Sequence, residues 1–286
     1  MDEKRRDMLK ITALGGLAAG AAALSSSASA QASAAESTLE RVRRTGELRV
    51  SILAGEAPFY VKNLSEGTWE GAGMLMAEDI AKALDVKLTI LEGSTANSIA
   101  DVQTGKADLA FPFNQSPQRA LAVRFTDTIY TQGIVYVSGS NVAGTKWEDL
   151  NKPDTKIATV IGGLADTLSR RYCPNAETTA YKTRDDAIVA AQAGRADVFV
   201  VAMMQGMGIR AKFPALSKIT LLEQPQLNLE SCMAIPKGAD YEWRDFLNAW
   251  IKSVRGSRQT TEWILQGFEK IGLKRDDIPD DVRARL

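Results

Sequence analysis

A short segment of this chain occurs twice. Residues 103–108 read QTGKAD and residues 192–197 read QAGRAD, so the segments share Gln, Gly, a basic residue, Ala and Asp in the same columns. Each copy follows an alanine-containing helical pattern and precedes an apolar run typical of a strand. A helix that ends at glycine before a strand beginning with Asp is a common joint of βαβ units, so one copy would indicate little. Two copies predict two similar α/β lobes, with a ligand cleft between them.

Short runs of strand-forming residues alternate with helical patterns along most of the chain. These runs lie at residues 47–53, 87–91, 107–111, 156–161 and 196–201. Such alternation is typical of parallel sheets with crossover helices, and it supports the α/β interpretation in both halves of the chain.

Two helices carry distinct signals. In the first, Ser37 and Glu40 predict a capping box at the start, and Gly46 predicts a left-handed end. The second has apolar residues at helical spacing on one face, which we interpret as core anchors rather than as a ligand cage. These residues are Trp243, Phe246, Leu247, Trp250, Ile251 and Val254.

Residues 1–30 have the pattern of an export signal. Arg5 and Arg6 lie in a charged stretch before the apolar run 11–24, which is shorter than the roughly 20 residues that cross a bilayer. The small residues before Gln31 favour cleavage after Ala30, and an uncleaved anchor is the alternative. The adjacent arginines resemble the twin-arginine export motif. We expect the twin-arginine or the general export machinery to deliver a periplasmic mature protein.

The composition excludes several kinds of site. The 286 residues include no histidine, so no Ser-His-Asp triad, Cys-His dyad or His-ligated metal site can form. Cys173 and Cys232 are too few for a four-thiolate site, although an oxidising compartment leaves a disulfide between them open. The 35 Lys and Arg residues balance 35 Asp and Glu residues, so no basic field attracts nucleic acid. We expect no metal, no cofactor and no nucleic-acid partner.

Seven short motifs follow one another in an order and spacing typical of one known family. They are TLERVRRTGELRV at 38–50, APF at 57–59, STANSI at 94–99, QTGKADLA at 103–110, SPQR at 116–119, RFTDTIY at 124–130 and AGRADVFV at 193–200. Together they resemble the periplasmic solute-binding proteins of polar amino acid importers, family 3 of the ABC transporter receptors.

The resemblance implies the type II periplasmic binding protein fold. In this fold two α/β lobes, each a mixed sheet flanked by helices, are joined by two crossover strands that serve as a hinge. The crossovers are expected near residues 130–135 and 229–234. Lobe 1 then comprises residues 38–131 and 231–286, and lobe 2 comprises residues 132–230.

The resemblance also implies a function. We expect a monomeric, non-catalytic receptor that captures a small carboxylate-bearing solute, an amino acid or a related compound, and delivers it to the permease of an ABC importer. Two alternatives stay open. One is an enzyme similar to the cyclohexadienyl dehydratases, with Glu56 as general acid. The other is a ligand-sensing partner of a membrane kinase.

Residues 113–119 hold the strongest candidates for the site. Ser116 and Pro117 predict a helix start, with Ser116 as N-cap. Arg119 carries a planar fork suited to a carboxylate, and the resemblance implies that it clamps the ligand carboxylate beside the Ser116 hydroxyl. Phe113 and Asn114, which precede this helix, are further candidate ligand-binding residues.

A second candidate lies at the end of the predicted strand 156–161. Gly162 and Gly163 place backbone N–H groups between that strand and a helix, an arrangement that favours anions. The resemblance implies a hydroxyl residue where Gly163 stands, so only backbone donors remain. The same glycines also indicate a tight turn with positive φ, and both interpretations can hold together.

Three positions depart from the pattern that the resemblance implies. Ala202 stands where the acid that pairs with a ligand α-ammonium is expected. Glu56 and Thr95 stand where two covering aromatics are expected. The pocket is therefore expected to be more polar than a typical amino acid cleft. Glu56 either pairs with a cationic group of the ligand or is a solvated loop carboxylate.

Overall fold

The computed structural model describes residues 36–139, 142, 144–238, 241–278 and 283. The predicted export signal, its arginine pair and its cleavage site lie outside these residues. Within them, none of the helices combines the length and the apolar character that a bilayer span requires.

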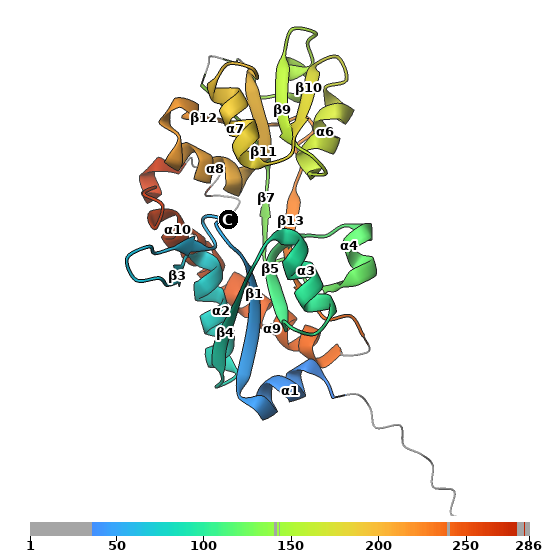
Figure 1. Ribbon diagram of the computed structural model, residues 1–286, viewed down its shortest axis with the longest axis vertical. Helices are drawn as coiled ribbons and strands as arrows, with labels where there is room; N and C mark the ends of the chain where they lie inside the picture. Colours follow the sequence, from blue (N-terminus) through green and yellow to red (C-terminus); the bar gives the residue numbers. More distant parts are fainter. Residues whose placement is uncertain (1–35, 140–141, 143, 239–240, 279–282, 284–286) are drawn as a thin grey trace, which may run out of the picture. The chain divides into compact units, whose positions relative to one another are not determined.

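One sheet has six strands in the order β4-β1-β5-β13-β6, with β7 also paired to β13 (Figure 1). The pairs β1–β4 and β1–β5 are parallel, whereas β13 is antiparallel to its three neighbours. The strands are β1 (Glu47–Leu53), β4 (Lys87–Gly93), β5 (Leu109–Asn114), β6 (Arg124–Phe125), β7 (Tyr130–Gln132) and β13 (Leu229–Ile235).

The other large sheet has five strands in the order β10-β9-β11-β8-β12. Strand β9 is parallel to β10 and β11, and β8 is antiparallel to β11 and β12. The strands are β8 (Ile134–Ser138), β9 (Lys156–Val160), β10 (Glu177–Tyr181), β11 (Val198–Ala202) and β12 (Lys218–Leu221). A separate two-stranded ribbon joins β2 (Val61–Lys62) to β3 (Trp69–Glu70).

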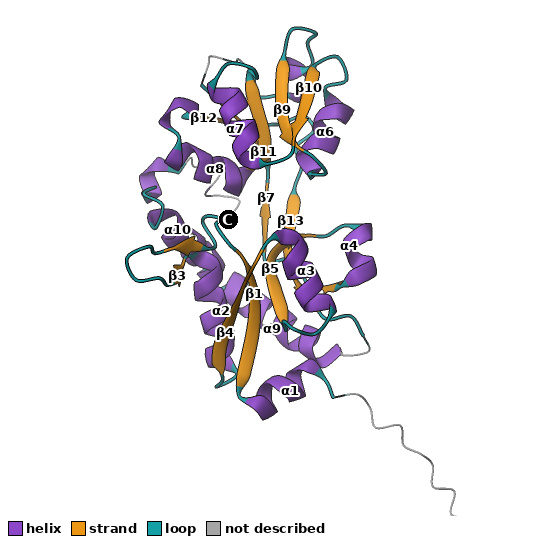
Figure 2. Cartoon of the chain, viewed as in Figure 1, coloured by secondary structure: helices purple, strands orange, loops and turns teal. Residues whose placement is uncertain are grey.

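Helices flank both sheets (Figure 2). Those packed with the six-stranded sheet, or with the helices that cover it, are α1 (Thr38–Thr45), α2 (Ala72–Ala83), α3 (Thr95–Gln103), α4 (Pro117–Ala122), α9 (Tyr241–Gly256) and α10 (Gln259–Glu269). Those packed with the five-stranded sheet, or with a helix that covers it, are α5 (Trp147–Leu150), α6 (Leu164–Tyr172), α7 (Arg184–Gln192) and α8 (Met203–Lys212). Two 3-10 turns, Pro214–Leu216 and Arg275–Asp277, complete the described elements. The predicted fold of two α/β lobes with mixed sheets is confirmed.

The chain passes twice between the two sheets. The first passage is at Gly133, between β7 and β8, and the second covers residues 222–228, between β12 and β13. Both lie at or beside the crossovers expected from the sequence. The lobe boundaries at 131/132 and 230/231 stay predictions.

The local signals in the sequence produce the expected elements. All five predicted strands are present, as β1, β4, β5, β9 and β11. Helix α1 has the complete Ser37–Glu40 capping box, and Gly46 ends it with φ of 66°. In α9, the apolar face predicted as core is buried at Trp243, Leu247, Trp250, Ile251 and Val254. Phe246, partly buried, stacks on Trp243 with ring centroids 5.7 Å apart.

The repeated segments form the same joint in both lobes. Asp108 accepts a hydrogen bond from the N–H of Arg49 at 2.7 Å, and Asp197 accepts one from the N–H of Lys156 at 2.8 Å. The glycines that precede them have φ of 72° at Gly105 and 68° at Gly194. Each joint therefore ends a helix and fixes the start of a strand beside a neighbouring strand.

Both cysteines are buried and free. The Cys173 thiol donates to the carbonyl oxygen of Trp147 at 3.3 Å, and the Cys232 sulfur accepts from Nε2 of Gln115 at 3.0 Å. The disulfide that the sequence left open is therefore not formed in this structure. Burial raises the pKa of the Cys173 thiol to about 11, and burial also raises that of Cys232.

Candidate functional site

Two adjoining cavities are lined by residues from both large sheets and their connecting loops. The small cavity has a volume of about 130 Å³ and includes Phe59, Phe113 and Tyr130 in its lining. The large cavity has a volume of about 700 Å³ and reaches the turn at Gly162. Four residues line both cavities: Asn114, Arg119, Ala202 and Gln205.

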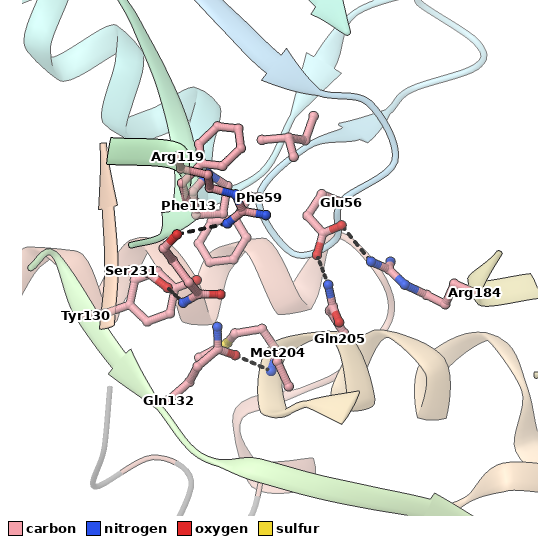
Figure 3. Close-up of a pocket in the computed structure, with 14 residues that line it drawn as sticks. Glu56, Phe59, Phe113, Arg119, Tyr130, Gln132, Arg184, Met204, Gln205 and Ser231 are labelled. Atoms are coloured by element: carbon pink, nitrogen blue, oxygen red, sulfur yellow. Dashed lines mark hydrogen bonds and ion pairs between the residues drawn. The ribbon is translucent and has the colours of Figure 1, made fainter. Parts of the chain in front are cut away.

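Arg119 lies where the two cavities meet. Its Nη1 donates to the carbonyl oxygen of Asn114 at 2.8 Å, and its guanidinium lies 5.6 Å from the centroid of the Phe113 ring (Figure 3). No carboxylate in the part of the chain that the structure describes pairs with it. Burial lowers the pKa of this guanidinium, which still keeps its charge because its ordinary pKa is far above neutrality. A half-buried cation without a counterion favours an anionic occupant.

The backbone around Arg119 is held by the predicted helix cap. The Ser116 Oγ accepts a hydrogen bond from the N–H of Arg119 at 3.2 Å, and Pro117 is the first residue of α4. The expected helix start is thus confirmed. The Ser116 hydroxyl oxygen therefore caps α4. Ser116 also lines the large cavity.

The Glu56 carboxylate accepts hydrogen bonds from two side chains of the other lobe. It lies in the loop after β1, and its Oε2 accepts from Nη2 of Arg184 at 2.9 Å. Its Oε1 accepts from Nε2 of Gln205 at 3.0 Å (Figure 3). The Glu56 side chain is 18% exposed. We expected the Glu56 carboxylate to face a ligand cation or solvent. It instead contacts the first residue of α7 and the first turn of α8.

Aromatic rings form one wall of the small cavity. Phe59 stacks on Tyr130 with ring centroids 5.3 Å apart, and Phe111 meets both rings edge-on. Burial raises the pKa of Tyr130, and its hydroxyl is hydrogen-bonded to Ser231. Tyr130 therefore remains a neutral phenol and adds no charge to the cavity.

Gln132 links β7 of the six-stranded sheet to α8, which packs with the five-stranded sheet, beside the small cavity. It ends β7, and its Oε1 accepts from the backbone N–H of Met204 in α8 at 3.0 Å (Figure 3). Among the residues that the structure describes, no protein acceptor is recorded for its Nε2, so this amide is available to a ligand in the cavity that it lines.

The glycine turn is formed as the sequence predicts, but it offers fewer donors. Gly162 has φ of 72°, and Gly163 is the N-cap of α6. The Gly163 N–H donates to the carbonyl oxygen of Val160 at 3.0 Å, so it is not free for an anion. Both glycines line the large cavity, which they share with Ser116.

Ala202 and Thr95 are the remaining positions that the sequence predicted for the site. Ala202 lines both cavities and places no charge there, as its side chain requires. Thr95 is the first residue of α3, and its side chain lies outside the described part of the chain.

Several lining residues were not predicted from the sequence: Arg184, Gln205, Gln132, Tyr130, Met204 and Ser231. One local signal was available for Arg184. It is the first residue of α7, before Asp185 and Asp186, and a cation is unfavourable at a helix N-terminus. An arginine in that position indicates a partner elsewhere, although the sequence does not indicate which.

The comparison with known proteins decides the family. Residues 48–266 match the model of the bacterial extracellular solute-binding proteins, family 3. This chain belongs to that family. The family predicted from the seven motifs is therefore confirmed, and it is a family of extracellular binding proteins for solutes.

Relatives of this family 3 protein differ in their sequence identity to it and in the share of each chain that aligns. The glutamine-binding protein of Geobacillus stearothermophilus is 25% identical over 211 residues, 70% of this chain and 79% of the relative. An ancestral cationic amino acid solute-binding protein, also described as a precursor of cyclohexadienyl dehydratase, is 27% identical with a TM-score of 0.66. That match covers 82% of this chain and 99% of the solved one.

A third relative is much longer than the match. Membrane-bound lytic murein transglycosylase F of Aeromonas hydrophila is 29% identical over 157 residues, 54% of this chain. The matched segment spans only 30% of the transglycosylase's length. The similarity to that enzyme therefore covers a part of it and not its whole length.

Proposed function

We propose that this protein is a receptor that captures a small carboxylate-bearing solute, an amino acid or a related compound, and delivers it to the permease of an ABC importer. The observation that carries the proposal is the position of Arg119. Its guanidinium is half-buried, lacks a counterion among the described residues and borders both cavities. A carboxylate is the natural partner of such a group because its two oxygens match the guanidinium fork.

The size of the cavities is compatible with a small solute. The large cavity, at about 700 Å³, falls within the ordinary range of ligand pockets, roughly 300–1,000 Å³. The small cavity adds about 130 Å³ beside the aromatic wall. A ligand held at Arg119 can therefore extend in either direction from its carboxylate.

Capture requires that the two lobes move. In this proposal lobe 1 comprises residues 38–131 and 231–286, and lobe 2 comprises residues 132–230. The chain passages at Gly133 and at residues 222–228 serve as the hinge. The ligand is then held between Arg119 on the first lobe and the Gly162 turn on the second.

Delivery requires a protein outside the cytoplasm. We propose that residues 1–30 direct export and are removed, so that a monomeric mature protein works in the periplasm. Membership of a family of extracellular binding proteins supports this location.

One observation favours an enzyme as a second candidate. A structural relative is described as a precursor of cyclohexadienyl dehydratase, and Glu56 borders the small cavity, where a general acid would act. Against it, the two oxygens of Glu56 already accept hydrogen bonds from Arg184 and Gln205. Incubation with a cyclohexadienyl carboxylate, followed by product analysis, distinguishes an enzyme from a receptor. A kinase-sensing partner would use the same cleft and differs only in what co-purifies with it.

The receptor is tested by Arg119→Ala. A charge-assisted hydrogen bond contributes about 1.5–3 kcal/mol, so the affinity for a carboxylate ligand should fall about tenfold to a hundredfold. The ligand is first identified by native mass spectrometry of the mature protein, and its affinity is measured by calorimetry. Arg195→Ala is the matched control, because Arg195 is exposed and lies in neither of these cavities. Unchanged affinity in Arg119→Ala contradicts the proposed clamp.

A further inference from the structure

The charges around the small cavity do not cancel. Among the residues described as lining either cavity, three side chains are charged: Glu56, Arg119 and Arg184. Glu56 and Arg184 form one ion pair, with 2.9 Å between Oε2 and Nη2. Arg119 is left over, and the lining as described carries one net positive charge.

The ion pair uses the one carboxylate among these lining residues. Gln205 takes the second oxygen of Glu56, so both oxygens are occupied by side chains from the other lobe. Ala202, which borders both cavities, provides no alternative acid. A ligand ammonium group in the small cavity would have to displace Arg184 or remain without a counterion, and an unpaired buried cation is strongly disfavoured.

Arg184 joins two distant segments of the chain through its ion pair with Glu56. It begins α7, where the helix dipole disfavours a cation, and two aspartates follow it in the same turn. Its guanidinium instead reaches Glu56, 128 positions earlier in the chain. Arg184 is 35% exposed and Glu56 is 18% exposed, so the pair lies at the edge of the cavity, within reach of a ligand.

We infer that Arg184 determines the charge selectivity of the site. By neutralising Glu56, it restricts the receptor to anionic solutes that carry a carboxylate but no ammonium group near it. This inference rests on the proposed function, since it takes Arg119 as the carboxylate clamp. It narrows the ligand class from amino acids and related compounds to their ammonium-free relatives.

The test removes Arg184 and leaves Glu56. Arg184→Gln keeps a polar side chain at the first position of α7 and relieves the unfavourable charge there, so the fold is retained. Binding is measured by calorimetry with matched probe pairs that differ only in the α-ammonium: 3-phenylpropionate with L-phenylalanine, and glutaramate with L-glutamine. The original protein should prefer the ammonium-free member of each pair. Arg184→Gln should shift that preference toward the amino acid by about tenfold or more, because Glu56 is then free to pair with the ammonium.

Two controls separate charge selectivity from other effects. The double variant Glu56→Gln, Arg184→Gln lacks both charges and should not gain amino acid binding. Arg195→Gln makes the same charge change on an exposed residue outside both cavities and should leave the preference unaltered.

The outcomes distinguish the inference from the proposed function. If Arg184→Gln keeps the original preference, or if the original protein already prefers the amino acids, the selectivity role is wrong while the receptor stands. If Arg119→Ala binds every probe as tightly as the original protein does, the carboxylate clamp itself fails. If no probe binds to the original protein or to Arg184→Gln, both proposals are rejected for carboxylates of this size.

Discussion

The two copies of the repeated segment make the same backbone joint but carry different electrostatic roles. Asp108 accepts from the N–H of Arg49 and also forms ion pairs with the guanidinium groups of Arg41 and Arg49, and its side chain is 1% exposed. Asp197 accepts from the N–H of Lys156, and no ion pair is recorded for it among the described residues. One motif is the centre of a buried ionic cluster, and the other is a partly exposed hydrogen-bond acceptor.

The difference comes from what packs beside each joint. Arg41 belongs to α1, an eight-residue helix that precedes β1 in the first lobe. In the second lobe, the helix before β9 is α5, which has only four residues and contributes a tryptophan and a leucine to the core. A repeated motif therefore predicts the backbone geometry in both lobes. Its contribution to the free energy of unfolding depends on neighbouring residues outside the motif.

The largest expected effect is on stability, at Asp108. Asp108→Ala leaves two arginines beside a vacated buried site, and breaking a buried ion pair typically costs about 3–5 kcal/mol. Asp197→Ala removes one side-chain acceptor of a backbone N–H and should cost about 1 kcal/mol. Urea unfolding of the two variants measures the difference. Equal losses would mean that the ionic cluster adds nothing to the joint, and Asp108→Asn replaces the first variant if that variant does not fold.

An intermediate effect is expected at the glycines of the two joints. Gly105 and Gly194 have positive φ, and an added Cβ would meet no atom within 4 Å at either position. The cost of alanine is therefore that of the left-handed backbone alone, about 1–2 kcal/mol in each lobe. Thermal unfolding of Gly105→Ala and Gly194→Ala should show similar losses. A much larger loss in one lobe would contradict the equivalence of the two backbones.

The smallest effect concerns the two thiols, Cys173 at the end of α6 and Cys232 within β13. Because burial raises the pKa of Cys173 to about 11, its thiolate fraction keeps increasing as the pH rises toward that value. Cys232 is shifted in the same direction by burial. Alkylation by iodoacetamide should be slow in both, and its rate should rise steadily between pH 7.5 and 9.5. A plateau at either thiol below pH 9 would show that its environment favours the thiolate.

The sequence predicted the parts of the fold that depend on local patterns. The alternating strands, the Ser37 cap, the Ser116 helix start and the αL glycines are set by residues within a few positions of one another. Local patterns do not predict short strands that form only by pairing with distant partners. β7 has only three residues, and it forms by pairing with Leu229–Ile235, much later in the chain.

The same limit applies to the site. Arg119 and Ala202 were placed from motifs and do line both cavities. The partners of Glu56 are 128 and 149 positions away, and no local signal connects them. The Gly163 N–H, predicted to face an anion, is used within its own turn by Val160, a bond that depends on the turn's conformation rather than on residue type.

The order of strands in the first sheet has a consequence for synthesis. All five strands of the second sheet lie between residues 134 and 221, so a chain that emerges amino end first can complete this sheet early. The first sheet, by contrast, lacks the strand between β5 and β6 until residue 235 has been made, and α9 and α10 follow later still. A chain that stops before residue 229 therefore lacks β13, the strand that pairs with β5, β6 and β7 in the first sheet.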